Sequence, residues 1–400
     1  MIGRTVAAAP VRPAVGVGSV VSALLCGIVV SAFAACAPDS SSARDAGSDD
    51  AADDRFEVPT TCGDGTLDPG EDCDGPDRQE CTTACETVGF RDCGTDCRWT
   101  PCAEDWPEEC NGSDDDCNGL VDESIWCPMS IGSSDTFLLG VWGASPGDVW
   151  VVGGVGVALH WNGAGWARHD DVTQWWVYGV WGASSDDVWV AGERSIAHWD
   201  GTAWTDLFRS PSGPWWLRTV AGSSATDVWA AGDEGVILHW TGSDWRAVPD
   251  PTPALLVWRI WALSTREAWA VGDATLRWNG TAWSDVSDAL PVSSAGLGGV
   301  SGSSDDDIWL VGLGGTIVHW DGASWSVVPG GTSADLTAVW AGSPRDAWAV
   351  GENGTIVRWN GSNWTQEESG TEVTLADVWG SSPADVWIVG DQGTVLRRQD

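Results

Sequence analysis

The stretch that decides the fold is DAWAVGENGTIVRW, which occupies residues 346–359. Its first three residues belong to an Asp/Glu-Val/Ala/Ile-Trp triplet that recurs along the chain, with the tryptophan at Trp150, Trp189, Trp229, Trp269, Trp309, Trp348 and Trp387. The spacing between these tryptophans is 39 or 40 residues throughout. A fixed period of this length is typical of repeat architectures, so the chain from residue 133 onward consists of copies of one structural unit.

Each copy reads approximately VWGxS, then DVWxVG, then GTIxHWxGxxW. Short alternating apolar runs broken by glycine predict strands and no helix. The third and fourth strands form a hairpin whose turn lies between two tryptophans that can pair across the strands. These pairs are Trp161/Trp166, Trp199/Trp204, Trp240/Trp245, Trp278/Trp283, Trp320/Trp325 and Trp359/Trp364. Four strands in about 40 residues make one blade, so we predict an all-β, seven-bladed β-propeller.

The two ends of the repeat region predict how the ring closes. The last repeat stops at residues 397–400, just before its fourth strand should begin, and a spare strand candidate lies at residues 125–130. A strand from one end that completes the last blade would hide both sheet edges. We therefore place the propeller at residues 125–400.

The motif at residues 346–359 resembles the BNR-like (Asp-box-like) propellers of the WD40/YVTN/BNR-like superfamily, which include photosystem assembly factors. The resemblance covers residues 133–400 and implies the propeller fold. The hairpin departs from the family's Asp-Gly-Gly-x-Thr-Trp turn, because here it reads Asn/Asp/Thr-Gly-x-x-Trp. Likeness of fold transfers no activity.

Composition excludes several functions. The net charge is −39 from 58 acidic and 19 basic residues, which excludes electrostatic binding to nucleic acid. A sialidase-like glycosidase, the enzyme that a BNR-like propeller suggests, would need a tyrosine nucleophile among clustered arginines. The single tyrosine is Tyr178, and the repeat pattern places no arginine set around it. We therefore expect no catalytic residues.

The first 35 residues predict a secretory signal, with Arg4 and Arg12 before an apolar run. Its end, SAFAAC, resembles the lipobox of bacterial lipoproteins and implies lipidation at Cys36. An uncleaved membrane anchor and ordinary cleavage are the alternatives. We expect an exported protein, lipid-anchored at the bacterial outer membrane, on the cell surface or the periplasmic face. Residues 36–61 are rich in Ser, Ala and Asp and form a disordered tether.

Residues 62–124, with Cys127, form a cysteine-rich module of low apolar content, for which disulfides rather than zinc are expected in an exported chain. The expected disulfide cysteines are Cys62, Cys73, Cys81, Cys85, Cys93, Cys97, Cys102, Cys110, Cys117 and Cys127, and their order leaves the connectivity open. The CGDG and PGEDCDG stretches at residues 62–75 resemble the cysteine-rich CGDG-type repeats of myxobacterial surface proteins.

A second motif, ECNGSDDDCNGLVDE at residues 109–123, resembles the CNGxDDDCxG type of metal-binding motif. Asp114, Asp116 and Asn118 at alternate positions before Gly119 match the first half of an EF-hand loop, and Asp122 falls at its ninth position. The twelfth position is Ile125, so the loop is incomplete. We expect a weak structural calcium site with a Kd of about 10⁻⁴ to 10⁻³ M. The alternative is a solvated acidic loop.

One recurring slot precedes the third-strand tryptophan. It holds His160, His198, His239 and His319 in four blades and Arg277, Arg358 and Arg397 in three. Because ligand histidines do not exchange with arginine, we expect an outward polar position opposite a core tryptophan rather than a metal ring. His169 has no visible partner in the pattern.

The tryptophans outside the repeat pattern are the candidate ligand-binding residues. Aromatic side chains stand just before or at the start of the first strands of the early blades, at Phe137, Trp175, Trp176, Trp215, Trp216 and Trp258. The matching positions of the last three blades are Gly296, Asp335 and Thr374. Flat rings at one face of a propeller suit a glycan or apolar peptide side chains, and a cap over the core is the alternative.

We therefore expect a monomeric surface protein that recognises a glycan or a surface or envelope protein. The alternatives are an envelope scaffold or assembly factor that uses the propeller as a docking platform, and a BNR-type glycoside hydrolase.

Overall fold

The computed structural model describes residues 78–82, 88–92, 110, 125–132, 136–170, 172–209, 216–252 and 256–399. The chain divides into two units, residues 1–58 and 59–400, and all described residues belong to the second. In the cysteine-rich region, strands β1 (Arg78–Thr82) and β2 (Val88–Asp92) form an antiparallel pair.

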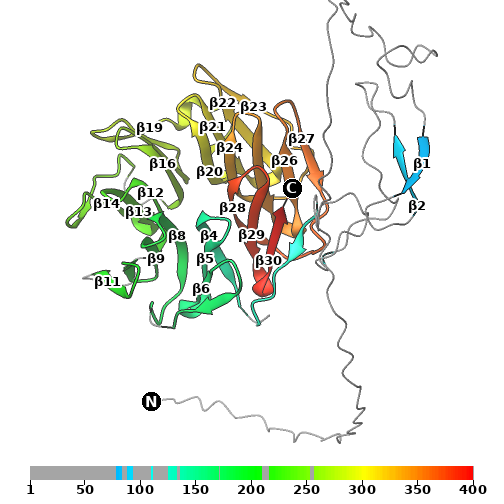
Figure 1. The fold of residues 1–400 in the computed structure, drawn as a ribbon. Coiled ribbons are helices and arrows are strands. Elements are labelled where there is room, and N and C mark those ends of the chain that lie inside the picture. The colour runs from blue at the N-terminus through cyan, green and yellow to red at the C-terminus, as the bar shows by residue number, and fades with distance from the viewer. Residues whose placement is uncertain are drawn as a thin grey trace, which may run out of the picture. The chain divides into compact units, whose positions relative to one another are not determined.

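The chain from residue 125 onward forms seven four-stranded antiparallel sheets, which confirms the predicted seven-bladed propeller (Figure 1). Blade 1 comprises β4 (Leu138–Ser145), β5 (Asp148–Gly153), β6 (Ala158–Trp161) and β7 (Trp166–Arg168). Blade 2 comprises β8 (Val177–Ser184), β9 (Asp187–Gly192), β10 (Ser195–Trp199) and β11 (Trp204–Arg209). Blade 3 comprises β12 (Leu217–Ser224), β13 (Asp227–Gly232), β14 (Ile237–Trp240) and β15 (Trp245–Ala247). Blade 4 comprises β16 (Val257–Ser264), β17 (Glu267–Gly272), β18 (Leu276–Trp278) and β19 (Trp283–Asp285).

The last three blades repeat the pattern. Blade 5 comprises β20 (Leu297–Ser304), β21 (Asp307–Gly312), β22 (Thr316–Trp320) and β23 (Trp325–Val327). Blade 6 comprises β24 (Leu336–Ser343), β25 (Asp346–Gly351), β26 (Ile356–Trp359) and β27 (Trp364–Glu367). Blade 7 comprises β28 (Leu375–Ser382), β29 (Asp385–Gly390), β30 (Val395–Gln399) and, from the other end of the propeller sequence, β3 (Cys127–Pro128). The helical turns of the described chain are all 3-10 turns: η1 (Gly154–Gly156), η2 (Asp233–Gly235), η3 (Ser287–Ala289), η4 (Ser294–Gly296), η5 (Leu313–Gly315), η6 (Glu352–Gly354) and η7 (Asp391–Gly393).

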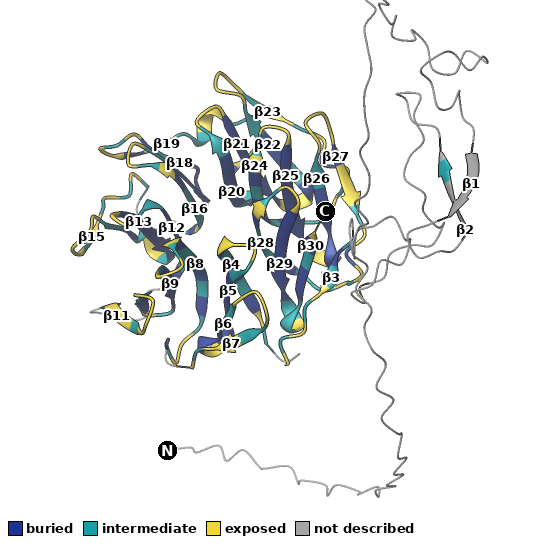
Figure 2. Cartoon of the chain, in the orientation of Figure 1, coloured by how far each residue is buried: buried dark blue, intermediate teal, exposed yellow. Residues whose placement is uncertain are grey.

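The first strand of each blade is the innermost. Successive first strands contact one another around the ring, and β28 of blade 7 contacts β4 of blade 1. In Figure 2 the second strands of the blades are largely dark blue, whereas the outer fourth strands and many connections are yellow, so the core lies toward the inner strands. Hydrophobic clusters combine residues of neighbouring blades, as where Trp348 of blade 6 packs with Val378 of blade 7.

Tryptophan pairs define each joint between blades. The second-strand tryptophan of every blade is almost fully buried, and its ring meets the fourth-strand tryptophan of the next blade edge to face. Ring centroids are 5.2–5.9 Å apart at interplanar angles of 79–89°, in the pairs Trp150–Trp204, Trp189–Trp245, Trp229–Trp283, Trp269–Trp325, Trp309–Trp364, Trp348–Trp126 and Trp387–Trp166. The predicted hairpin tryptophans also pair directly across their strands in six blades.

Strand β3 supplies the seventh joint. It pairs antiparallel with β30 through Cys127 opposite Arg397, so Trp126 takes the place that Trp166 has in blade 1. The Trp126 indole donates a hydrogen bond to Glu367 at 3.1 Å, and Cys127 forms a disulfide with Cys110. The ring is therefore completed by the two paired residues of β3 and by Trp126.

Candidate functional site

One face of the propeller is built from two kinds of connection. The first strand of a blade begins where the second strand ends, so the residue before each first strand meets the turn after the second. In six blades the first residue of that turn donates a backbone hydrogen bond of 2.8–3.0 Å to the residue immediately before the first strand, which we call the lead residue. The glycine that ends each second strand permits this approach, because a Cβ there would collide with the lead residue's backbone.

The lead residues differ strongly around the ring. They are Phe137, Trp176, Trp216 and Leu256 in blades 1–4, and Gly296, Asp335 and Thr374 in blades 5–7. The hydrogen-bonding pattern shows that these residues are structurally equivalent, as their sequence positions indicate. The large apolar side chains therefore belong to blades 1–4, whereas in blade 6 Asp335 accepts a 2.6 Å hydrogen bond from the backbone of Gly314.

The aromatic face, as we name it, comprises Phe137, Trp175, Trp176, Tyr178, Trp216 and Trp258. The side chains of Phe137, Trp175, Trp216 and Trp258 are 40–48 % exposed, although each is large and apolar. The rings of Phe137 and Trp176 lie 5.8 Å apart, and those of Trp176 and Tyr178 lie 6.3 Å apart and nearly parallel. The structure thus brings five of the six predicted ligand-binding residues to one face, and Trp215 lies outside the described residues.

Arg218 of β12 lies at the centre of this face and was not predicted. Its guanidinium carbon is 5.0–5.3 Å from the ring centroids of Tyr178, Trp216 and Trp258. The same guanidinium donates two hydrogen bonds to Asp233, at 2.9 and 3.2 Å. The periodic spacing of Tyr178, Arg218 and Trp258, each the second residue of a first strand, is the signal that could have found it.

A second arginine covers Trp175. The Arg194 guanidinium carbon lies 4.6 Å from the Trp175 ring centroid, and this side chain is exposed. The two arginines hold the indole rings by cation–π attraction, so that the flat surfaces keep a defined orientation while remaining open to solvent.

Tyr178 is surrounded differently from what the repeat pattern indicates. No arginine set was expected near it, but Arg218 lies over its ring. Burial raises the pKa of Tyr178, and Glu193 and Asp233 act in the same direction, whereas Arg218 opposes them. The net result is a pKa above the ordinary value of 10.0, set mainly by burial of the phenol.

An ion pair joins two blades that are not neighbours in the ring. Arg259 of β16 in blade 4 contacts Asp377 of β28 in blade 7 at 3.2 Å and donates to the Ala376 carbonyl at 3.1 Å. Asp377 also accepts a 3.1 Å hydrogen bond from the backbone of Val141 in blade 1. Burial raises the pKa of Asp377, and Arg259 counteracts that rise.

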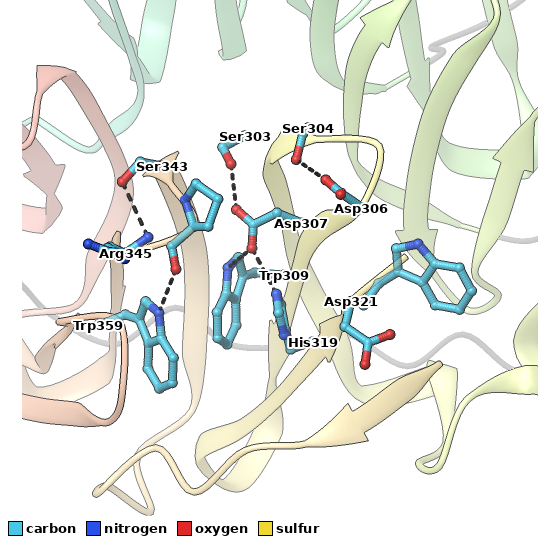
Figure 3. Close-up of polar contacts among 12 residues, drawn as sticks. Ser303, Ser304, Asp306, Asp307, Trp309, His319, Asp321, Ser343, Arg345 and Trp359 are labelled. Atoms are coloured by element: carbon cyan, nitrogen blue, oxygen red, sulfur yellow. Dashed lines mark hydrogen bonds and ion pairs between the residues drawn. The ribbon is translucent and has the colours of Figure 1, made fainter. Parts of the chain in front are cut away.

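The recurring His/Arg slot is a structural element. Each histidine pairs with the acid that begins the second strand, at 2.7–2.8 Å, as His319 does with Asp307 in Figure 3. Arg277, Arg358 and Arg397 pair with the equivalent acids at 2.8–3.0 Å. These side chains lie over the second-strand tryptophan, with His319 and Trp309 centroids 4.0 Å apart. The histidines are only 17–23 % exposed, so the position is less outward than predicted.

His169 likewise differs from the expectation that it stands alone. Its ring lies 4.8 Å from that of Trp150 and 5.1 Å from that of Trp199. His169 is therefore part of the aromatic packing between blades 1 and 2. Among the described residues, no group of three or more His, Cys, Asp or Glu side chains is arranged to hold a metal ion.

Several predicted site residues fall outside the described part of the chain. These are Cys36, the calcium-ligand candidates Asp114, Asp116, Asn118 and Asp122, and the side chains of the expected disulfide cysteines other than Cys110 and Cys127. Within the residues that the structure does describe, there is no helix with the length and apolarity needed to cross a bilayer.

Solved structures of other proteins share this fold at low identity. YCF48 bound to a D1 peptide is 19 % identical with a TM-score of 0.59, over 70 % of this chain and 99 % of that one. A catalytically inactive virginiamycin B lyase from Staphylococcus aureus with quinupristin is 17 % identical with a TM-score of 0.60, over 68 % and 98 %. The WD40 propeller domain of Doa1 is 14 % identical with a TM-score of 0.56, over 68 % and 94 %. No protein-family model matches the chain, and no curated protein sequence matches it.

Proposed function

We propose that this chain is an exported surface lipoprotein whose propeller recognises a glycan or a protein ligand through the aromatic face, without catalysis. The observation that carries the proposal is the gathering of exposed apolar side chains. Of the nine large hydrophobic residues exposed in the described chain, four belong to this face, Phe137, Trp175, Trp216 and Trp258, and two more, Val155 and Leu313, lie in the turns that follow the second strands. Exposed apolar surface of this kind marks an interface more often than it marks ordinary solvent-facing surface.

The chemistry of the face favours binding over turnover. The Arg218 guanidinium is already engaged by the Asp233 carboxylate, and burial raises the pKa of the Tyr178 phenol. Aromatic rings held by arginine offer flat contact area with little side-chain entropy to lose, which is favourable for recognition. We therefore propose that the protein binds its ligand without catalysis. Release of reducing ends from glycans would instead favour a glycosidase.

The second candidate function is a scaffold or assembly role in the envelope, with the propeller as a docking platform. The solved structure of YCF48 with a D1 peptide supports it, because that propeller of similar fold holds a polypeptide. In both versions the lipid at Cys36 anchors the chain to the outer membrane, and calcium at Asp114, Asp116, Asn118 and Asp122 stabilises the cysteine-rich module. A co-purifying envelope protein would favour this second candidate.

The test compares the full chain with a Trp175→Ala/Trp216→Ala variant on a glycan array and against a displayed peptide library, with and without calcium. Both tryptophans are about half exposed, so the variant should keep the circular dichroism spectrum of the parent. We expect binding that falls at least tenfold in the variant, as for truncation of interface hot spots, by about 1.4 kcal/mol or more. Leu207→Ala, on strand β11, is the matched control because Leu207 is 42 % exposed but lies outside the aromatic face. Equal binding by all three proteins would contradict the proposal.

A further inference from the structure

Val155 has a backbone conformation that β-branched residues avoid. It lies in η1 with φ 53° and ψ 49°, in the left-handed region where a branched Cβ crowds its own backbone. Its side chain is 68 % exposed, so packing inside the propeller does not account for a valine here. Strained residues of this kind are found where a surrounding structure or a ligand makes use of them.

The other blades show that the turn itself does not need valine. The equivalent left-handed residues are polar or glycine: Arg194, Glu234, Gly314, Asn353 and Gln392, with φ between 55° and 71°. Asparagine and glycine adopt this conformation readily, and blades 5 and 6 use them. The valine in blade 1 is therefore explained by what its side chain presents to solvent.

Val155 lies in a turn that packs against the aromatic face. The Trp176 ring lies against the same turn, since a Cβ on Gly154 would be 3.5 Å from its ring carbons. Gly154 also donates its backbone hydrogen bond to the Phe137 carbonyl at 2.8 Å, and the Phe137 and Trp176 ring centroids are 5.8 Å apart. Val155 is the next residue of the turn that these contacts hold against Phe137 and Trp176, and we call these three residues the anchor surface.

The composition of the anchor surface favours a polypeptide ligand over a glycan. A pyranose packs its flat face on aromatic rings and forms hydrogen bonds at its rim. A branched aliphatic side chain provides neither a flat ring nor a hydrogen-bonding group for the sugar. Val155, and Leu313 at 58 % exposure on the turn of blade 5, are suited to the apolar side chains of a polypeptide. Tryptophan, tyrosine and arginine, the other components of the face, are the residue types that dominate protein–protein hot spots.

The charge of the turns on this side of the propeller restricts the class of partner further. The turns that follow the second strands carry six acids, Glu193, Asp233, Glu234, Asp273, Glu352 and Asp391, of which Glu193 pairs with Arg194 and Asp233 with Arg218. The chain as a whole has a net charge of −39. A basic partner is therefore attracted to this face, and an acidic one is repelled.

Resting on the proposed function, we infer that the ligand is a polypeptide segment with net positive charge, and that one of its apolar side chains packs on Phe137, Val155 and Trp176. The acidic turns attract the positively charged polypeptide, and the anchor surface then binds its apolar side chain. The strain at Val155 is then a feature of recognition, so relieving it should improve folding and impair binding at the same time.

The experiment pans a phage-displayed library of random linear peptides against the full chain and measures affinity for the enriched peptides by fluorescence anisotropy. We expect peptides that combine Lys or Arg with an apolar residue. Val155→Asn, which copies Asn353 of blade 6, should weaken their binding about tenfold, in the range for loss of a hot-spot side chain. The same substitution should raise the thermal midpoint, because it relieves the left-handed valine. Val327→Thr is the control, since Val327 is 53 % exposed but lies on β23, outside the aromatic face.

Opposite outcomes would overturn the inference in distinguishable ways. If the enriched peptides bind Val155→Asn as tightly as they bind the parent chain, the anchor surface is not part of the binding site. Enrichment of acidic peptides would overturn the charge argument. Glycan binding that the Trp175→Ala/Trp216→Ala variant loses, with no peptide enrichment, would overturn the polypeptide ligand and leave the proposed function intact. Absence of both glycan and peptide binding would overturn the proposed function as well.

Discussion

At the scale of single residues, the acid that begins each second strand stabilises its blade through several short contacts. Asp307 accepts hydrogen bonds from His319 at 2.8 Å, from the Ser303 hydroxyl and from the Trp309 indole at 3.1 Å (Figure 3). Burial opposes ionisation of this carboxyl, but the hydrogen bonds from His319 and Ser303 outweigh it and lower its pKa below the ordinary 3.8. A lowered pKa in the folded state means that the stabilisation is present above pH 3.8 and is lost as pH falls through the folded pKa.

We therefore predict that Asp307→Asn lowers the free energy of unfolding at pH 7 by about 1–3 kcal/mol. The difference in unfolding free energy between the parent and the variant should shrink as pH falls below 3.8, because the parent then loses the same interaction. Urea unfolding at pH 7 and at acidic pH measures both values. Asp306→Asn is the control, since Asp306 is exposed and accepts a hydrogen bond from Ser304, and its effect should stay within about 0.5 kcal/mol. A deficit that persists unchanged in acid would contradict the assignment.

At the scale of elements, strand β3 is short but occupies an essential joint. Its two paired residues form few backbone hydrogen bonds, so the stabilisation comes mainly from Trp126, which is 7 % exposed. Trp126 meets Trp348 at 5.2 Å edge to face, and Glu367 accepts hydrogen bonds from both Trp126 and Arg398. Arg398 replaces the third-strand tryptophan of the other blades and lies 5.3 Å from the Trp348 ring centroid.

Trp126→Ala should accordingly lower the free energy of unfolding by about 3–5 kcal/mol, as for other truncated core tryptophans. The measurement is chemical denaturation followed by tryptophan fluorescence. Trp166→Ala, which removes the equivalent ring of blade 1, is the matched comparison and should have a similar effect. A loss below about 1 kcal/mol for Trp126→Ala alone would mean that the ring closes without this joint.

At the scale of the whole molecule, the Arg259–Asp377 pair ties blade 4 to blade 7 and, through Val141, to blade 1. Breaking a largely buried ion pair leaves one charge without its partner, which is more destabilising than removing both. We predict that Arg259→Met lowers the free energy of unfolding by about 3–5 kcal/mol at pH 7, and that Arg259→Met/Asp377→Asn lowers it less.

The pH dependence of this pair runs opposite to that of Asp307. Burial raises the pKa of Asp377, so its ionised form is unfavourable in the folded state above the ordinary 3.8, and stability is recovered as pH falls through the raised value. The deficit of Arg259→Met should therefore become smaller between pH 7 and mildly acidic pH. A deficit that grows on acidification, or a double variant worse than the single one, would show that the pair does not act in this way.

The number of blades, the strands in each blade and the tryptophan pairs of the hairpins were all predictable from the amino-acid sequence. This was possible because each blade repeats the same local pattern, and period and alternation are properties of the chain. The sequence also placed the unusual aromatic residues at the starts of the first strands of blades 1–4. Their spacing relative to the repeat is visible without coordinates.

The side chains that meet across blades could be identified only in the folded ring. The contact of Arg218 with Tyr178 and Trp258, the bond from Arg259 to Asp377 and the packing of His169 each join residues of different blades or turns. Such contacts depend on how the ring closes. The strain at Val155 likewise appears only in the backbone angles. Local patterns therefore determine the blades, whereas the geometry of the closed ring determines the surface that they present.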